Sequence, residues 1–122
     1  MGTLKCLDTY ALIEIVKGNP HYMNYLTGEF VIPDPTLAEF SWVLHRDYSE
    51  ADAEHWTEKL KNYCSAVNKT TLLNAVKFRY KHRKNNISFF DAIGYTYAQE
   101  HHLPFVTGDK EFKHFPDVEF LK

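Results

Sequence analysis

The sequence has 122 residues, of which 44% are hydrophobic and 16% aromatic, so disorder is excluded and the chain suits one domain over residues 1–122. Its 14 Lys and Arg residues and 16 Asp and Glu residues leave a formal net charge of −2, which excludes a strong overall attraction to nucleic acid. No apolar run approaches the ~20 residues of a membrane span and no signal segment opens the chain, so we expect a soluble cytoplasmic protein without a membrane partner.

Strands and helices alternate in the first half of the sequence. The predicted elements are a strand over residues 3–7, a helix from Thr9 to about Lys17, a short helix over 20–26, a strand or an extended entry into the next helix over 30–33, a helix from Pro35 with Asp34 as its cap, and a helix over 50–64 with Ser49 as its cap. Cys6 and Cys64 lie in apolar stretches without metal-type spacing, and we expect both to be buried, reduced thiols.

The same alternation continues in the second half. It predicts a strand over 65–68, a helix from Thr70 or Thr71 to Lys84, a helix from Phe89 to about His101 with Ser88 as its cap, a strand over 103–107, a turn at Gly108 and Asp109, and a strand over 118–121. On the helix that ends at Lys84, Leu73, Val76 and Tyr80 predict the buried stripe. Strands that alternate with helices predict an α/β fold with a central parallel sheet flanked by helices on both faces.

Four acidic residues stand where such a sheet gathers its ligand-binding side chains. Asp8 and Asp109 follow the carboxyl ends of predicted strands, and Glu39 and Asp91 lie near the starts of predicted helices. Because strand ends of a parallel sheet meet at one edge, we expect these carboxylates to lie close together. Clustered carboxylates need a cation between them, and oxygen ligands favour Mg²⁺ or Mn²⁺. Zinc is not expected, because the sequence has neither HExxH nor paired CxxC spacing.

Each of these acids also has a purely structural interpretation. Asp8 could cap the following helix, although Thr9 can do so instead and leave the Asp8 carboxylate free. Glu39 could be a surface residue favoured by the helix dipole. Asp91 could form a capping box with the residue that caps its helix, and Asp109 could serve a tight turn. A single acid therefore indicates little, and the shared position at one sheet edge carries the prediction of a site.

Four segments of the chain resemble the four acidic motifs of PIN domains, in the order in which that family carries them. They are Leu7–Glu14, Thr36–Phe40, Ser88–Ala92 with the following Tyr97 and Ala98, and Leu103–Phe112, and they span essentially the whole chain, whereas residues 48–85 match only in helical character. The resemblance implies a Rossmann-like PIN fold and cleavage of an RNA substrate that depends on Mg²⁺ or Mn²⁺. The compact form is similar to VapC-type toxins, which implies a homodimer and a cognate antitoxin protein with a segment in the active-site groove.

The resemblance also implies roles for single residues. Asp8, Glu39, Asp91 and Asp109 would be catalytic in metal-dependent phosphodiester hydrolysis. Asp8 and Asp91 would bind metal directly, Asp109 directly or through water, and Glu39 would bind metal or orient the attacking water. Thr9 and Thr107 match positions whose hydroxyl groups support the acidic cluster.

An acidic pocket repels RNA, so basic residues elsewhere must hold the nucleic-acid backbone. Lys77, Lys81 and Lys84 form a basic stripe on their predicted helix, which is either a solvated face or a phosphate contact. Arg46, two turns after Glu39, is a further possible RNA contact.

Two other classes of protein share some of these features. A receiver domain has a similar length and an alternating sheet, but it needs an Asp at the end of the mid-chain strand, where this sequence has Asn68 and Lys69. The alternative to the enzyme is therefore a non-catalytic PIN-like module that binds RNA or protein.

Overall fold

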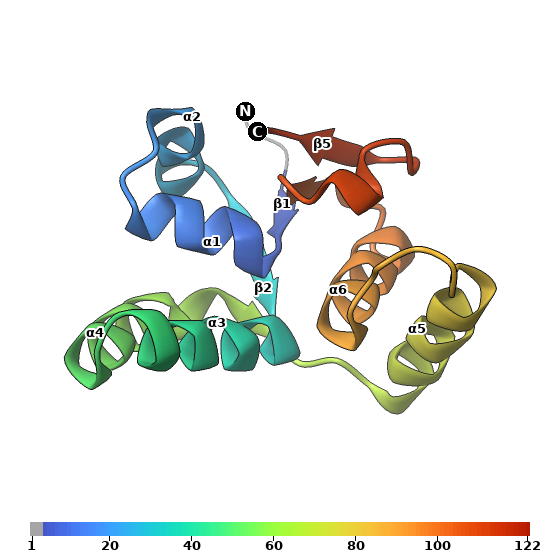
Figure 1. The fold of residues 1–122 in the computed structure, drawn as a ribbon, viewed down its shortest axis with the longest axis horizontal. Helices are drawn as coiled ribbons and strands as arrows, with labels where there is room; N and C mark the ends of the chain where they lie inside the picture. The colour runs from blue at the N-terminus through green and yellow to red at the C-terminus, as the bar shows by residue number, and fades with distance from the viewer. Residues whose placement is uncertain (1–3) are drawn as a thin grey trace.

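The computed structural model describes residues 4–122, and its strands form a five-stranded parallel sheet (Figure 1). The strands are β1 (Lys5–Leu7), β2 (Phe30–Pro33), β3 (Cys64–Ser65), β4 (Phe105–Thr107) and β5 (Val118–Phe120). The helices are α1 (Thr9–Val16), α2 (Pro20–Met23), α3 (Asp34–Asp47), α4 (Glu50–Leu60), α5 (Lys69–Lys81) and α6 (Phe89–Glu100). Because the strand order is β3-β2-β1-β4-β5, the first strand of the chain lies at the centre of the sheet.

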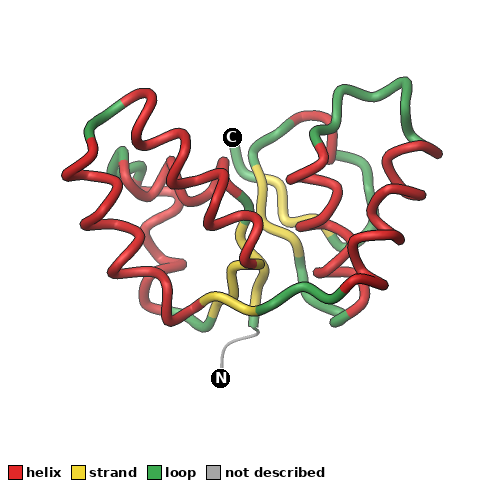
Figure 2. Tube along the Cα trace, turned by 90° about the horizontal axis from the view of Figure 1, so that it is seen from below, coloured by secondary structure: helices red, strands yellow, loops and turns green. Residues whose placement is uncertain are grey.

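Successive residues of the central strands belong to two different hydrophobic cores, because side chains alternate between the two faces of a strand. Leu7 and Val106 pack in the core formed with α1, α2, α3 and α4. Cys6 and Phe105 pack in the core formed with α5 and α6. In Figure 2 the strands run between these two groups of helices. The predicted α/β fold, with a parallel sheet flanked by helices on both faces, is confirmed.

The prediction was wrong at the boundary between the helix over 50–64 and the strand over 65–68. The helix ends at Leu60, and a 3₁₀ turn over 61–63 leads directly into β3. This strand consists of Cys64 and Ser65, which pair with the end of β2. The ring of Tyr63 stacks on that of Phe30, with 4.3 Å between the centroids, so the turn is held against the sheet. Contacts with β2, which the local sequence does not reveal, therefore set this boundary.

Other ends shift by a few residues. The strand predicted from residue 3 is described from Lys5, and Thr3 lies outside the described residues. The helix predicted from Pro35 begins at Asp34, with Pro33 in the cap position. The helix predicted over 20–26 is α2 followed by a 3₁₀ turn over 24–27. Both cysteines are free, although only Cys6 is fully buried. Within residues 4–122, no helix is both long enough and apolar enough to cross a membrane.

The prediction of a buried stripe on α5 was wrong. Leu73, Val76 and Tyr80 are 64%, 49% and 67% exposed, respectively. The face that packs toward α6 carries Thr71, Ala75 and Phe78 instead, and the ring of Phe78 lies 5.2 Å from that of Tyr95 in α6. The hydroxyl of Thr71 also donates a hydrogen bond to a carboxylate oxygen of α6. The helical period identified an apolar stripe, but the contacts with α6 determined which face of α5 was buried.

Candidate active site

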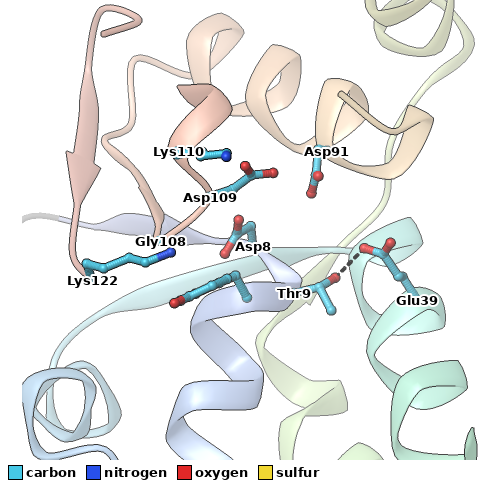
Figure 3. Close-up of a pocket in the computed structure, with 9 residues that line it drawn as sticks. Asp8, Thr9, Glu39, Asp91, Gly108, Asp109, Lys110 and Lys122 are labelled. Atoms are coloured by element: carbon cyan, nitrogen blue, oxygen red, sulfur yellow. Dashed lines mark hydrogen bonds between the residues drawn. The ribbon is translucent and has the colours of Figure 1, made fainter. Parts of the chain in front are cut away.

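One pocket brings together all four acids that the sequence singled out (Figure 3). Its lining consists of Asp8, Thr9, Tyr10, Glu39, Asp91, Gly108, Asp109, Lys110 and Lys122. The acids come from four places in the chain, namely the end of β1, the helices α3 and α6, and the turn after β4. The pocket lies at the carboxyl ends of the central strands, where open α/β sheets bind their ligands.

Asp8 caps α1 and still presents a carboxylate oxygen without a partner. Its Oδ1 accepts a hydrogen bond from the Ala11 N–H at 2.8 Å. Its Oδ2 is buried and has no hydrogen-bond partner, and the residue is only 2% exposed. Burial raises the pKa of Asp8 well above its usual value and outweighs the Thr107 hydroxyl and the Ala11 N–H, which lower it, while the charges of Asp91 and Asp109 raise it by smaller amounts. The sequence left two alternatives for Asp8, a helix cap or a free carboxylate. In the structure, Oδ1 caps the helix and Oδ2 remains free.

Thr9 does not cap the helix. Its hydroxyl donates a hydrogen bond to Glu39 Oε1 at 2.5 Å, which joins the start of α1 to α3. The contact fixes one oxygen of the Glu39 carboxylate at the edge of the pocket, as the dashed line in Figure 3 shows. Glu39 is therefore not the ordinary surface residue of the structural interpretation.

Asp91 lies in the first turn of α6, where Ser88 caps the helix by accepting a hydrogen bond from the Asp91 N–H at 3.1 Å. Burial raises the pKa of Asp91 to about 7, and the charges of Glu39 and Asp109 contribute to the increase. One turn later, Gly94 lets the side chain of Phe105 in β4 pack closely against α6. A Cβ at that position would lie 3.2 Å from Cε1 of Phe105.

Asp109 holds the turn that follows β4. Its N–H donates to the hydroxyl of Thr107 at 3.0 Å, and its Oδ1 accepts from the Glu111 N–H at 3.0 Å. The fully buried Thr107 thus anchors the backbone of an acid in the pocket. Asp109 also caps the 3₁₀ turn over 110–112, as its structural interpretation expects, and it lines the pocket as well.

The donor set suits a hard divalent cation. All four acids offer oxygen only, and the Oδ2 of Asp8 is unpartnered. Burial and mutual repulsion raise the pKa values of Asp8 and Asp91, and a bound cation would lower both values. Among residues 4–122, no three His, Cys, Asp or Glu side chains are close enough to hold one ion between them. The carboxylates therefore share a pocket without forming a closed coordination shell, and repulsion between like charges favours such a separation.

The family model of the PIN domain matches residues 5–118. The chain belongs to the PIN domain family. The comparison with curated proteins found no significant match.

Solved structures with this fold include several VapC and VapBC proteins. VapC20 of Mycobacterium tuberculosis, a toxin that cleaves the sarcin–ricin loop, superposes with a TM-score of 0.80 at 14% identity over 96% of this chain and 99% of the other. VapBC2 of Rickettsia felis, bound to a fragment of promoter DNA, gives 0.75 at 16% identity over 98% of each chain. A toxin–antitoxin complex from Klebsiella pneumoniae gives 0.69 at 21% identity over 94% and 95%. At these identities, the likeness establishes the PIN fold.

The pocket of this PIN domain also contains residues that the sequence did not single out. Tyr10, Lys110 and Lys122 line it, and Lys122 lies outside the four acidic motifs, ten residues after the last of them. Lys110 directly follows Asp109, so its position was open to prediction, whereas that of Lys122 depends on how the segment after β5 folds back.

The possible RNA contacts named from the sequence lie outside the pocket. Lys77, Lys81 and Lys84 are exposed, and Lys84 lies beyond the end of α5. Arg46 is exposed and forms two hydrogen bonds of 2.8 Å with Asp47.

Proposed function

We propose that this PIN domain is a metal-dependent endoribonuclease that hydrolyses phosphodiester bonds of RNA at the four-carboxylate pocket with Mg²⁺ or Mn²⁺. The observation that carries the proposal is the buried, unpartnered Oδ2 of Asp8 in a pocket lined by Glu39, Asp91 and Asp109. A buried carboxylate without a partner is costly, and a bound cation removes that cost. Membership of the PIN domain family supports the same activity.

The residues of the pocket divide the chemistry between them. Asp8 and Asp91 would hold the ion, and Asp109 would hold it directly or through water. When bound, a divalent ion makes water acidic at neutral pH and stabilises the leaving oxygen. Glu39, with Oε1 fixed by the Thr9 hydroxyl, keeps Oε2 available to orient the attacking water. Thr107 supports the site by holding the backbone of Asp109.

We also propose that the chain acts in the cytoplasm as the toxin of a VapBC-type pair, with a small antitoxin protein as its partner. Support comes from the fold shared with VapBC proteins over 98% of the chain. Additional phosphate contacts from Lys77, Lys81, Lys84 and Arg46 would extend RNA binding beyond the pocket, since all four side chains are exposed.

The test of the activity is cleavage of labelled single-stranded RNA by the purified, antitoxin-free protein. We expect Mn²⁺ or Mg²⁺ to support cleavage and EDTA to stop it. An Asp91→Asn variant should lose more than ~100-fold in activity. That loss exceeds the one typical of substitutions at residues that only hydrogen-bond to a metal ligand. The matched control is Asp52→Asn, an exposed aspartate in the first turn of α4, which should cleave like the wild type. A folded wild-type protein that binds RNA without cutting it would instead establish the non-catalytic module.

We propose further that the exposed apolar stripe of α5 forms a homodimer contact. Leu73, Val76 and Tyr80 stand at helical positions i, i+3 and i+7 and present one continuous apolar edge. Val76→Asp and Tyr80→Asp should each convert a dimer to a monomer in sedimentation velocity, with little change in the melting temperature of the monomer because these side chains are exposed. Tyr48→Asp, at an exposed site after α3, is the control and should leave the dimer intact. An unchanged dimer in both α5 variants contradicts this interface.

A further inference from the structure

The acidic pocket carries two positive side chains at its mouth. Lys110 and Lys122 line it together with the four carboxylates, and Figure 3 shows both lysines on the side of the pocket formed by β4 and β5. Among residues 4–122, neither ammonium group lies within 4.0 Å of a carboxylate oxygen of an Asp or Glu. Two cations beside four acids thus keep their capacity to bind an anion.

Long-range contacts place Lys122 at this position. After β5, the Leu121 N–H donates to the carbonyl of Thr107 at 3.0 Å, and the Leu121 carbonyl accepts a hydrogen bond from the Tyr22 hydroxyl. The chain therefore runs beside Gly108, and Lys122 emerges over the pocket. Its Nζ lies 5.7 Å from the centroid of the Tyr10 ring, a cation–π contact with an aromatic residue that also lines the pocket.

Lys110 is placed by the turn that carries Asp109. It is the first residue of the 3₁₀ turn over 110–112, and the Asp109 carboxylate caps this turn through the Glu111 N–H. The Lys113 N–H donates to the Lys110 carbonyl at 3.2 Å, which closes the turn. Both lysines are thus attached to short, hydrogen-bonded segments at the pocket.

We propose that Lys110 and Lys122 bind phosphate groups of the RNA backbone at the mouth of the pocket, next to the scissile phosphodiester. The inference rests on the proposed ribonuclease function and deepens it, because it assigns to two named side chains the charge that lets a polyanion approach four carboxylates. A lysine ammonium is a compact cation suited to phosphate oxygen. Lys110 and Lys122 line the pocket where the phosphodiester would be cleaved, whereas the lysines of α5 do not.

Salt dependence of RNA binding tests this assignment. Each phosphate contact to a single strand contributes about −0.7 to the slope of log K against log salt concentration. We therefore expect the Lys110→Gln, Lys122→Gln double variant to bind a labelled single-stranded RNA more weakly and with a slope flatter by about 1.4, measured by fluorescence anisotropy over about 50 to 200 mM KCl. Ca²⁺ replaces Mn²⁺ in this assay, and a gel verifies that the RNA stays intact.

Two control variants separate charge at the pocket from charge in general. Lys59→Gln removes an exposed lysine of α4 that also lies over an aromatic ring, that of Trp56 at 5.0 Å, and should leave the slope unchanged. Lys122→Arg keeps the positive charge and should retain the wild-type slope. Melting temperatures of all variants verify that the fold is intact.

The outcomes distinguish this inference from the proposed function. A double variant with the wild-type slope and affinity overturns the role of the lysines, while cleavage by the wild type in Mn²⁺ leaves the ribonuclease in place. A flatter slope in a protein that never cleaves RNA supports the lysine contacts and overturns the catalytic proposal. A wild type that binds no RNA overturns the phosphate contacts.

Discussion

Replacing Asp8 with asparagine is expected to abolish metal-dependent RNA cleavage and, at the same time, to stabilise the metal-free protein. Asparagine keeps the Oδ1 that accepts from the Ala11 N–H, so α1 retains its cap. The change replaces the buried, unpartnered carboxylate oxygen with the nitrogen of a neutral amide, so it removes a buried negative charge and relieves repulsion from Asp91 and Asp109. An unpaired buried charge costs more than an unpaired neutral polar group, so the free energy of unfolding should rise in EDTA by on the order of 1 kcal/mol.

The pH dependence of stability gives the same expectation for Asp91 with a defined sign. Its pKa is about 7 in the folded protein and about 3.8 in the unfolded chain. At a pH between these two values, Asp91 is therefore protonated to a greater extent in the folded state than in the unfolded state. The free energy of unfolding of the metal-free protein therefore falls as pH rises from about 4 to about 7, by up to about 1.4 kcal/mol per pH unit for one such carboxyl group. Asp91→Asn should flatten this dependence.

Urea titrations in EDTA and in Mn²⁺ measure these effects. Mn²⁺ at about 100 times its dissociation constant should stabilise the wild type by about 2.7 kcal/mol and should stabilise Asp8→Asn much less. Asp52→Asn, the exposed control on α4, should show the wild-type response to both pH and metal. Loss of stability in metal-free Asp8→Asn, or cleavage that survives the substitution, would contradict the assignment of Asp8.

The local sequence was sufficient to predict which acids follow the ends of strands. Asp8 and Asp109 follow β1 and β4 as expected, and a parallel sheet brings such strand ends to one edge. Residue type did not determine their hydrogen bonds. Asp8 caps α1, and the hydroxyl of Thr9 donates a hydrogen bond to Glu39 instead, because α3 lies next to the start of α1. That proximity is a property of the tertiary structure.

The positions that escaped prediction depend on distant partners. The apolar stripe of α5 has helical period, yet the contact with α6 buries Thr71 and Ala75 instead. Lys122 reaches the pocket because its neighbour Leu121 bonds to Tyr22, 99 residues earlier in the sequence. No local pattern contains such a contact. The sequence therefore predicted the four acids of the pocket, whereas the position of Lys122 is known only from the tertiary structure.

Gly108→Ala is expected to produce the largest structural damage of any conservative change at the pocket. A Cβ at this position would lie 2.6 Å from the carbonyl oxygen of Leu121 and would overlap the ring of Tyr10. The carbonyl is backbone and cannot rotate away, and its displacement would break its hydrogen bond with Tyr22 and the Leu121 N–H bond to Thr107. Overpacking of this kind costs about 1–3 kcal/mol and occasionally more.

The same clash should disable the pocket, because Tyr10 and the segment that carries Lys122 must both move. We expect Gly108→Ala to melt at a lower temperature than the wild type and to bind RNA with a salt dependence flatter by about 0.7, the contribution of the one phosphate contact assigned to Lys122. Gly28→Ala is the matched control, since its nearest atoms would lie 3.9 Å from the new Cβ and its backbone is extended, so its melting temperature should hardly change. Equal melting temperatures for Gly108→Ala and the wild type would show that the segment after β5 is not packed against Gly108, and the placement of Lys122 over the pocket would fail with it.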